Sequence, residues 1–487
     1  MYNSHAFKFA LVLSALFCAP FIIANIYFVD DIARAMNGYS ALSPLGRPLA
    51  DVILHSVNFN ADRIADIAPL TQILCAPVLA VAVYFAAKGM FGTAGIKEIL
   101  IASPVAINPF FIQNLAYKFD SLPMSTGVMC VCVGFYLCTT RKSTNLVGSA
   151  ILLVSALCLY QPVTNTFFGL VACYIASMAY GKESVKQILI EYAKCAAVFV
   201  VSYALYLKFI LPVFSLTERG ELVSLDAEGL SLAVHNLMQI WFLSGYFVNS
   251  FTIYIFKAAI ALSVISLAFL IYLHKESHVQ WVVRVLLVAV ASLAALLSVC
   301  GPTFLLEVFT PFPRILSGTG ALVSFVLLIA FYPLSAVEGI NRRASFLAVF
   351  AAIPVIYTIS MSYAFVNAQR AQQAYENAII NEISRDLKSE NKRYAYFYGD
   401  AELSPYTKNN IAAFPFIARI ISPMYDWTTS LTLQSKGVRD VYLNREISKE
   451  AMRKVCSGEL KPELAGDVSK VKIGSDVVYF ISPSVCN

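Results

Sequence analysis

The chain has 487 residues, of which 58% are hydrophobic and 14% charged, and its formal net charge is +6. Soluble domains carry about 25% charged residues, so this composition excludes an ordinary cytosolic enzyme and a disordered protein. The positive charge lies in short clusters rather than on one basic face, which argues against nucleic acid as a partner. Residues 367–487 hold 30 of the 66 charged residues. We therefore expect a transmembrane domain over 1–366 and a small water-soluble domain over 367–487.

Apolar segments of about 20 residues, the length that crosses a bilayer, recur throughout the first domain. Eleven segments meet this description: 7–28, 67–87, 98–115, 122–140, 145–162, 164–180, 188–210, 252–273, 281–301, 316–334 and 344–366. Segment 98–115 contains two prolines, and the short pair 145–162 and 164–180 is either two spans or one re-entrant hairpin. The predicted fold is a polytopic α-helical membrane protein with about 11 transmembrane helices.

The short loops between these segments differ in charge. One set is almost entirely basic and contains Lys88, Lys97, Arg141, Lys142, Lys182, Lys186, Lys275, Arg342 and Arg343. Loops rich in Lys and Arg stay in the cytoplasm, so we expect a cytoplasmic N-terminus. With an odd number of spans, the C-terminal domain lies on the outer face, which is the periplasm if the organism is Gram-negative.

The stretch 29–65 is the most unusual outer loop, because it is too apolar to be solvated and too polar to span. Apolar residues recur at helical spacing on both sides of the Ser43-Pro44 and Gly46-Arg47-Pro48 breaks. This pattern predicts two short amphipathic helices that lie on the outer membrane surface.

Two adjacent carboxylates, Asp30 and Asp31, follow the first apolar segment, and Arg34 lies one helical turn further on. Charged groups at such a place are costly to desolvate and need partners. One interpretation is a helix cap with a local ion pair to Arg34. The other is a general base that takes a proton from a sugar hydroxyl, with the neighbouring carboxylate in a positioning role.

A second polar group lies in N-L-A-Y-K-F-D-S-L-P-M, residues 114–124. Asn114, Tyr117 and Lys118 share a helical face if the helix continues through them. Tyr and Lys are also common at membrane interfaces. The functional alternative is a polar wall in which Asp120 is a second acid and Lys118 lies near a phosphate.

Two further positions carry weaker signals. Gln161 and Asn165 flank Pro162 and could contact sugar hydroxyls or hydrogen-bond between helices. Arg314 is the only strong cation in its predicted outer loop. It could bind a lipid-linked phosphate or extend towards lipid headgroups.

The C-terminal segment is predicted to be a small α/β domain. Strands are expected at 394–398 and 438–443, a hairpin at 470–473 and 477–481, and helices at 371–390 and 447–456. Aromatic residues around 394–398 and 425–427 could stack on sugars, although core packing is the more frequent use. In an oxidising compartment Cys456 and Cys486 could form a disulfide; buried free thiols are the alternative.

These features together resemble the GT-C glycosyltransferases. D-D-I-A-R, the following G-Y-S and G-R-P-L, N-L-A-Y-K-F-D-S-L-P-M and L-Y-Q-P are similar to the bacterial serotype-conversion glucosyltransferases, the Gtr family, which modify O-antigen. The motifs lie in the first third of the chain, whereas length and topology agree along all of it.

The resemblance implies transfer of a single sugar, typically glucose, from undecaprenyl phosphate to an O-antigen repeat unit of lipopolysaccharide. The reaction would invert the anomeric carbon at the periplasmic face of the inner membrane, within membrane lipid. By the same resemblance either Asp30 or Asp31 is the base, with Asp30 slightly preferred, and Arg47 or Arg314 steadies the leaving phosphate. Asn114, Tyr117, Asp120 and Gln161 would line the sugar site. The need for a divalent cation stays open, since the sequence offers carboxylates without a clear ligand set.

Two other functions fit parts of the pattern. A transporter or flippase of a lipid-linked saccharide places charges near the bilayer midplane and often has inverted repeats. Here the charges gather at the outer interface and the halves show no repeat, which favours chemistry at one face. A GT-C enzyme with lipid A or protein as acceptor is the third alternative.

Overall fold

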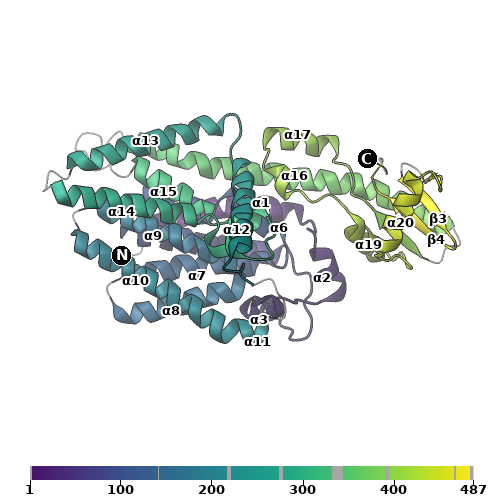
Figure 1. Cartoon of the computed structure of the whole chain (residues 1–487), viewed down its shortest axis with the longest axis horizontal. Coiled ribbons are helices and arrows are strands. Elements are labelled where there is room, and N and C mark those ends of the chain that lie inside the picture. The colour runs from purple at the N-terminus through teal and green to yellow at the C-terminus, as the bar shows by residue number, and fades with distance from the viewer. Residues whose placement is uncertain are drawn as a thin grey trace. The chain divides into compact units, whose positions relative to one another are not determined.

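The computed structural model describes residues 3–140, 142–181, 183–215, 221–273, 278–331, 344–389, 394–465, 468–482 and Cys486. Of the basic loop residues used above, Arg141, Lys182, Lys275, Arg342 and Arg343 lie outside this described part, as do residues 332–334 of one predicted span. The chain forms two compact units. Unit 1 contains Met1–Asn25 and Ser40–Ser362, and unit 2 contains Ile26–Tyr39 and Tyr363–Asn487 (Figure 1).

Unit 1 consists of helices. Its long ones are α1 (Ser4–Ala24), α4 (Leu70–Phe91), α7 (Ser121–Thr139), α8 (Ser143–Tyr160), α9 (Thr166–Tyr180), α10 (Val185–Leu205), α13 (Thr252–Leu273), α14 (His278–Leu297) and α15 (Thr319–Phe331), followed by α16 (Ala344–Ser389). Within the described residues, seven helical segments are long and apolar enough to cross a membrane, or eight if a bent pair counts as one span. The chain is therefore a polytopic helical membrane protein, whereas the predicted count of about eleven is not confirmed.

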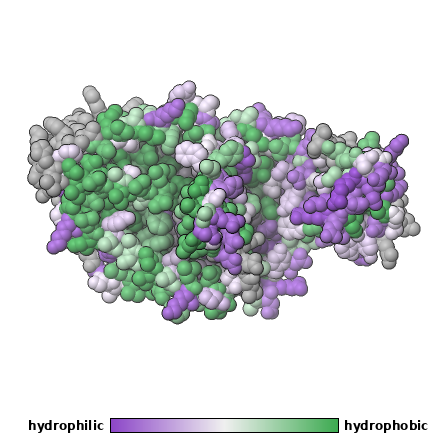
Figure 2. Space-filling view, viewed as in Figure 1, coloured by the Kyte–Doolittle hydropathy of each residue, from purple (hydrophilic) through white to green (hydrophobic). Residues whose placement is uncertain are grey.

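The surface of unit 1 is largely apolar, which accounts for the high hydrophobic fraction of the chain. Large apolar side chains are strongly exposed on several spanning helices, such as Leu16 on α1, Ile151 on α8 and Val200 on α10. Figure 2 shows hydrophobic side chains over most of the visible helical surface. A soluble protein rarely exposes apolar patches of this extent, so these helices face lipid.

The predicted span 98–115 is not one straight helix. It is α5 (Ile96–Ala102), a short 3-10 turn (η2, Ser103–Val105) and α6 (Pro109–Ala116), and the pair bends by 66°. Proline removes a backbone donor and clashes with the preceding turn, and Pro104 and Pro109 both fall at the bend. Asn108 begins α6 by accepting a hydrogen bond from Phe111 N at 3.2 Å. α6 ends at Ala116, and Tyr117 is extended with ψ 112°. The helix therefore does not continue through Tyr117 and Lys118, and the predicted shared face with Asn114 is wrong.

Two short helices are present in the stretch 29–65, as predicted, but the first buries Asp31 and Arg34 rather than an apolar face. They are α2 (Asp31–Asn37) and α3 (Pro48–Asn58), with a 3-10 turn (η1, Ser43–Leu45) between them. The two helices belong to different units, because Ile26–Tyr39 groups with the C-terminal segment. This partition differs from the expected one, in which the whole stretch belonged to the transmembrane domain.

Unit 2 contains a four-stranded sheet with strand order β1-β4-β3-β2. The strands are β1 (Ala395–Tyr398), β2 (Glu463–Ala465), β3 (Val468–Ile473) and β4 (Asp476–Phe480). β1 runs parallel to β4, and β3 and β4 form the predicted antiparallel hairpin. The predicted strand 438–443 is wrong: only Val441 bridges to Ala395. The preceding Asp440 has φ +63°, which takes the backbone out of the β region.

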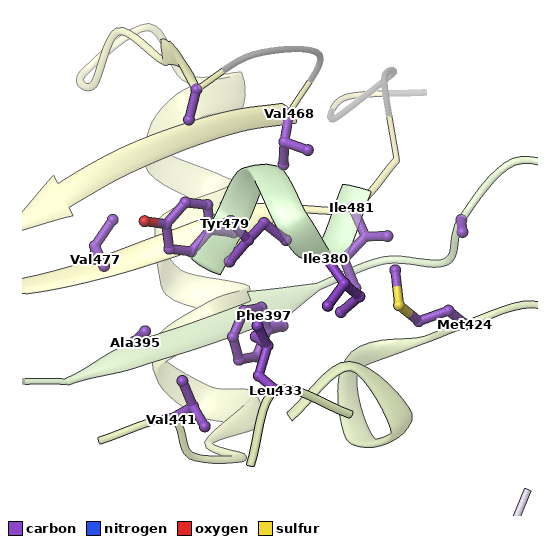
Figure 3. Close-up of a cluster of buried hydrophobic side chains, with 13 residues drawn as sticks. Ile380, Ala395, Phe397, Met424, Leu433, Val441, Val468, Val477, Tyr479 and Ile481 are labelled. Carbon is purple, nitrogen blue, oxygen red and sulfur yellow. The ribbon is translucent and has the colours of Figure 1, made fainter. Parts of the chain in front are cut away.

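Helices cover both faces of this sheet. On one face Ile380 and Ile383 of α16, with Leu433 of α19 (Asp426–Ser435), pack against Phe397 and Tyr479 (Figure 3). The other face packs against α20 (Arg445–Cys456). The remaining helices are α17 (Pro405–Ala413) and α18 (Ile417–Ile420). Tyr396 and Phe397 are 7% and 1% exposed, so they serve core packing rather than sugar stacking.

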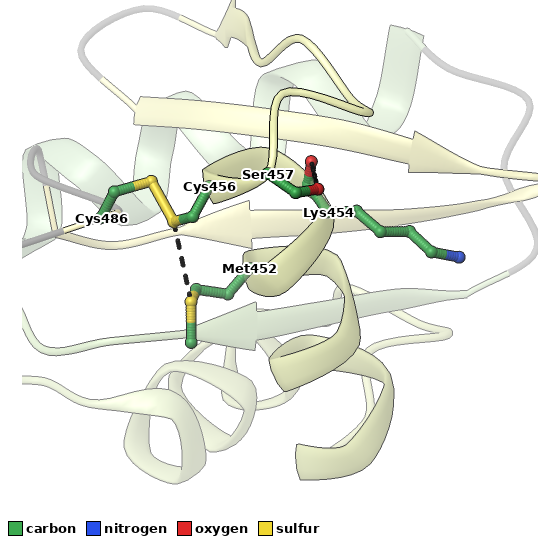
Figure 4. Close-up of a disulfide and its surroundings, with 5 residues drawn as sticks. All are labelled: Met452, Lys454, Cys456, Ser457 and Cys486. Atoms are coloured by element: carbon green, nitrogen blue, oxygen red, sulfur yellow. Dashed lines mark hydrogen bonds between the residues drawn. A yellow bond between two sulfur atoms is a disulfide. The ribbon is translucent and has the colours of Figure 1, made fainter.

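Cys456 at the end of α20 and Cys486 form a disulfide, with their Cα atoms 5.5 Å apart (Figure 4). The other nine cysteines are buried free thiols, as expected of cysteine used as a small apolar side chain.

Candidate functional site

The acidic pair lies in unit 2, where its two carboxylates have different environments. Asp31 is 1% exposed, and its Oδ2 accepts a hydrogen bond from Phe28 N at 2.9 Å. Asp30 is half-buried at the N-cap of α2 and makes no side-chain capping bond there. The structure therefore distinguishes a buried carboxylate held by backbone from a neighbour with access to solvent.

Arg34 is also buried, at 6% exposure, on the same short helix. Its carbonyl accepts the Gly38 N–H at 2.7 Å, and Gly38 ends α2 with φ +72°. Glycine adopts this left-handed conformation without steric cost, so α2 ends there after seven residues. α2 packs against α19 of the same unit.

Asp30 is close enough to Tyr425 to act on its ionisation. Burial, followed by the negative charges of Asp30 and Asp426, raises the pKa of Tyr425 to about 12. Asp426 itself forms an ion pair with Arg445 at 2.8 Å. The Tyr425 hydroxyl is therefore protonated at neutral pH and lies within electrostatic range of the Asp30 carboxylate.

A cationic cluster lies in unit 1 around the loop between η1 and α3. Arg47 Nε donates to Gln161 Oε1 at 2.8 Å, and Gln161 Nε2 donates to Leu45 O and Tyr206 Oη at 2.9 Å each. Gly46 has φ +74°, and a Cβ atom there would lie 2.5 Å from the Tyr206 hydroxyl. The loop conformation and the close approach both require glycine in G-R-P-L.

Arg314 lies in the same region of unit 1. Its Nη1 donates to Tyr117 Oη, its guanidinium carbon lies 4.9 Å from the centre of the Tyr117 ring, and its backbone N donates to Gln113 Oε1 at 3.2 Å. Tyr160 connects the two cations: its ring is 4.7 Å from the Arg47 guanidinium carbon, and its hydroxyl donates to Arg314 O at 3.4 Å.

The charges in this cluster act on one another. Burial lowers the pKa of Arg47; Tyr160 and Asp120 raise it, and Arg314 lowers it further. Two guanidinium groups that repel each other in a partly desolvated site attract an anion strongly, because an anion relieves the repulsion. Guanidinium forks match the geometry of a phosphate. The arrangement is therefore suited to binding a phosphate group.

The other residues predicted at 114–124 are buried nearby. Asn114 is fully buried, its Nδ2 donates to the weak acceptor Met124 Sδ at 3.2 Å, and its Oδ1 accepts no hydrogen bond from the described residues. Lys118 is 4% exposed and pairs with Asp66 at 3.3 Å, which ties it to the chain before α4. Asp120 is buried at the N-cap of α7.

The structure thus brings Arg47, Asn114, Tyr117, Gln161 and Arg314 together in unit 1 and places Asp30, Asp31 and Arg34 in unit 2. Sequence reasoning missed Gln113, Tyr160 and Tyr206 as members of the cluster. Tyr160 lies in the L-Y-Q-P motif, which could have indicated that it belongs to the site. Tyr206 lies within an apolar segment, where nothing in the sequence distinguishes it from a tyrosine used for packing.

An apolar pocket of about 320 Å³ also lies in unit 1. It is lined by Phe247, Val248 and side chains of α13, α15 and the first part of α16. Phe247 stacks on Phe110 of α6 with ring centres 6.1 Å apart, and α6 carries Gln113 and Asn114. The pocket is thereby in contact, through one pair of rings, with the helix that supports the cationic cluster. Among the described residues, no group of three or more His, Cys, Asp or Glu side chains could hold a metal ion.

Comparison with known proteins identifies the family. Residues 19–331 match the family described as "Glucosyl transferase GtrII". The chain belongs to the GtrII glucosyl transferase family. It is also 28% identical over 438 residues, 88% of this chain and 89% of the relative, to an uncharacterized 55.3 kDa protein in the gtrB 5′ region of Salmonella phage P22. Membership of the family supports glycosyl transfer in O-antigen modification.

The match of this GtrII glucosyl transferase to its family spans every polar residue described above from Asp30 to Arg314. It ends before α16 and the C-terminal segment. The acidic pair and the cationic cluster therefore both lie in the part of the chain that defines the family.

Proposed function

We propose that this protein transfers a single glucose from undecaprenyl phosphate to an O-antigen repeat unit, with inversion at the anomeric carbon. The acceptor hydroxyl forms a bond to the anomeric carbon as the bond from that carbon to the phosphate oxygen breaks. The hydroxyl proton passes to a carboxylate, and the lipid phosphate leaves with the electron pair.

The observation that carries this proposal is the unequal burial of the acidic pair. Asp30 is half-buried and can meet a ligand, so it is the general base. Asp31, 1% exposed and bound to Phe28 N, is a positioning residue that holds the turn at the start of α2. A base must reach the proton that it removes, and only Asp30 has that access.

The leaving phosphate is assigned to Arg47 and Arg314. The Arg47 guanidinium group is fixed by its hydrogen bond to Gln161, and that of Arg314 by its hydrogen bond to Tyr117. Because both side chains are already ordered, little side-chain entropy is lost when an anion binds. Lys118, already paired with Asp66, and Asp120 hold the surrounding polar wall. Asn114 Oδ1, buried without a hydrogen bond in the described part of the chain, is available to a sugar hydroxyl.

The isoprenoid chain of the donor is assigned to the apolar pocket of about 320 Å³ in unit 1. Its position beside the ring that stacks on α6 supports a donor whose apolar tail and charged phosphate bind neighbouring parts of one unit. This two-part chemistry fits a polyprenyl phosphate better than a nucleotide sugar.

We place the reaction at the periplasmic face of the inner membrane, with a cytoplasmic N-terminus. The distribution of Lys and Arg among the short loops supports this orientation. A disulfide in unit 2 fits an oxidising compartment. The gtrB-region origin of the phage relative fits a role in serotype conversion.

The test is reconstitution of the full chain in liposomes with undecaprenyl-phosphate-glucose and unglucosylated lipopolysaccharide, followed by mass analysis of the polysaccharide. We expect one added hexose per modified repeat unit, joined by the bond of inverted configuration. Transfer from UDP-glucose alone, or retention of configuration, would contradict the donor or the mechanism. Movement of lipid-linked sugar across the bilayer without added hexose would indicate a transporter.

A further inference from the structure

A polar pocket of about 220 Å³ lies within unit 2. The segment before and within α2, one face of α16, and the chain from Ser422 into α19 form its walls. Its lining residues are Tyr27, Val29, Ile32, Gln369, Gln373, Glu376, Asn377, Ile380, Ser422, Pro423, Met424, Thr428, Thr432 and Ser435. Val29 and Ile32 flank the acidic pair in sequence, so the segment that forms one wall of the pocket also carries Asp30.

The lining chemistry is that of a carbohydrate site. Among the described lining residues none is a cation, whereas amides come from α16 and hydroxyls from the other wall. Apolar side chains close one end: Ile380 and Met424 are members of the buried cluster against the sheet, as Figure 3 shows. Sugars present hydroxyl groups and apolar C–H faces, and specific sites combine an apolar lining with a few placed polar groups.

Two side-chain amides in the pocket each use one polar atom in a hydrogen bond within the protein and leave the other for a ligand. Gln373 Nε2 donates to Tyr27 O at 2.7 Å, and Lys436 Nζ donates to Asn377 Oδ1 at 2.9 Å. Gln373 Oε1 and Asn377 Nδ2 make no hydrogen bond with the described residues. These side chains lie one helical turn apart on α16 and offer an acceptor and a donor along one wall of the pocket.

Glu376 adds a carboxyl group deeper in the same wall. It is 7% exposed, and its Oε1 accepts hydrogen bonds from Gln372 Nε2 at 2.8 Å and Met424 N at 2.7 Å. Its Oε2 has no hydrogen-bond partner in the described part of the chain. Burial raises the pKa of Glu376 to about 7, so near neutral pH it can donate to a hydroxyl or accept from one.

We infer that this pocket binds one sugar residue of the acceptor polysaccharide and so positions the neighbouring hydroxyl at Asp30. The inference rests on the proposed function and names its acceptor subsite. An anionic donor phosphate is disfavoured here, because the lining holds a carboxyl group and no cation. A volume below the roughly 300 Å³ of drug-sized sites suits a single monosaccharide rather than several.

The test is direct binding of O-polysaccharide, without donor and without turnover, to the full chain in nanodiscs by isothermal titration calorimetry. The probe is the lipid-free polysaccharide released from lipopolysaccharide of the source strain after deletion of this gene. Asn377→Ala is expected to weaken binding about five- to tenfold, the effect of one hydrogen bond to a ligand. Thr432→Phe, which fills the pocket, is expected to weaken it at least tenfold.

Asn381→Ala is the matched control. Asn381 lies one turn further along α16 and also accepts from Lys436 Nζ, at 3.3 Å, but it does not line the pocket. Its affinity should stay within twofold of wild type, and thermal unfolding should verify that all three variants are folded. Wild-type affinity in folded Asn377→Ala and Thr432→Phe overturns the inference.

Turnover separates this inference from the proposed function. If the chain transfers sugar, the two pocket variants should raise KM for the polysaccharide and leave KM for undecaprenyl-phosphate-glucose unchanged; a rise only in the donor KM overturns the acceptor assignment. If the chain transfers no sugar but polysaccharide binding still depends on Asn377 and Thr432, the proposed function fails and the pocket assignment stands.

Discussion

The two units of this protein carry opposite polar chemistry. In unit 1, Arg47 and Arg314 lie against tyrosine rings within an apolar helical framework. In unit 2, Glu376 lies among amides and hydroxyls, next to a sheet with an apolar core, and the same unit contains Asp30. The difference suggests a division of labour: cations and an apolar pocket suit a lipid phosphate, whereas carboxyl groups and amides suit a neutral sugar.

The largest effect is expected from Asp30→Asn, which removes the proposed base while keeping the shape of the side chain. Transfer should fall by about 10²- to 10⁴-fold, the usual contribution of general base catalysis, with unchanged thermal unfolding. Asp31→Asn should cost less than tenfold, because an amide oxygen can still accept the Phe28 N–H. Asp62→Asn, at an exposed carboxylate, is the control. Loss in Asp31→Asn with full activity in Asp30→Asn would reverse the two roles.

Removal of the disulfide should destabilise unit 2 selectively. The Cys456–Cys486 bond closes a separation of 30 residues, for which the chain-entropy relation gives about 3–4 kcal/mol. Cys456→Ser with Cys486→Ser should therefore make sites in residues 394–482 accessible to protease at lower temperature than in wild type. Cys300→Ser, at a buried free thiol of unit 1, should leave that profile unchanged. Alkylation of both cysteines in wild-type protein without reductant would show that the bond is absent.

Glu376→Gln should change how stability depends on pH. α16 is about 70 Å long at 1.5 Å per residue, so Glu376 lies beyond its apolar spanning part. The pKa of Glu376 is raised from the usual 4.5 to about 7. The folded chain therefore binds more protons than the unfolded chain between these values, and the free energy of unfolding falls as pH rises from about 4.5 to 7.

The total effect is about 3 kcal/mol, from 1.36 kcal/mol per pKa unit. Above pH 7 the loss is complete and stability is level with respect to this group. Glu376→Gln keeps an acceptor for Gln372 and Met424, so it should be more stable than wild type above pH 7 and lack this slope. Asn381→Ala is the control, because it changes the same helix without removing a titratable group, and it should keep the wild-type slope. An identical slope in Glu376→Gln and wild type, measured by thermal unfolding from pH 4.5 to 8, would contradict the assignment.

The smallest effect is expected from Arg314→Lys, which keeps the charge but loses the fork and the stacking on Tyr117. KM for the lipid-linked donor should rise about tenfold, with the acceptor KM unchanged. Arg63→Lys, at an exposed arginine of unit 1, should leave both values within twofold. If the acceptor KM rises instead, the proposed separation of the two ligands by charge is wrong.

The local elements were predictable because each depends on a short stretch of chain. Apolar segments of sufficient length predicted the helices of unit 1, and the alternation on both sides of Gly474–Asp476 predicted the β3–β4 hairpin. The prediction failed where backbone conformation interrupts a favourable pattern, at Asp440 before Val441. The alternation of apolar and polar residues reports side-chain character, but it does not predict the φ angle of a single residue.

The sequence by itself determined that the protein is a membrane protein with a polar C-terminal segment, and its motifs singled out Asp30, Asp31, Arg47, Gln161 and Arg314. Only the tertiary structure decided which of these meet. Arg314 and Tyr117 are 197 residues apart, and Tyr27 and Gln373 are 346 apart. Such contacts arise when helices pack, and packing depends on the shapes of many surfaces at once. For the same reason the different burial of two adjacent aspartates, and the pocket beside them, could not be read from their order in the chain.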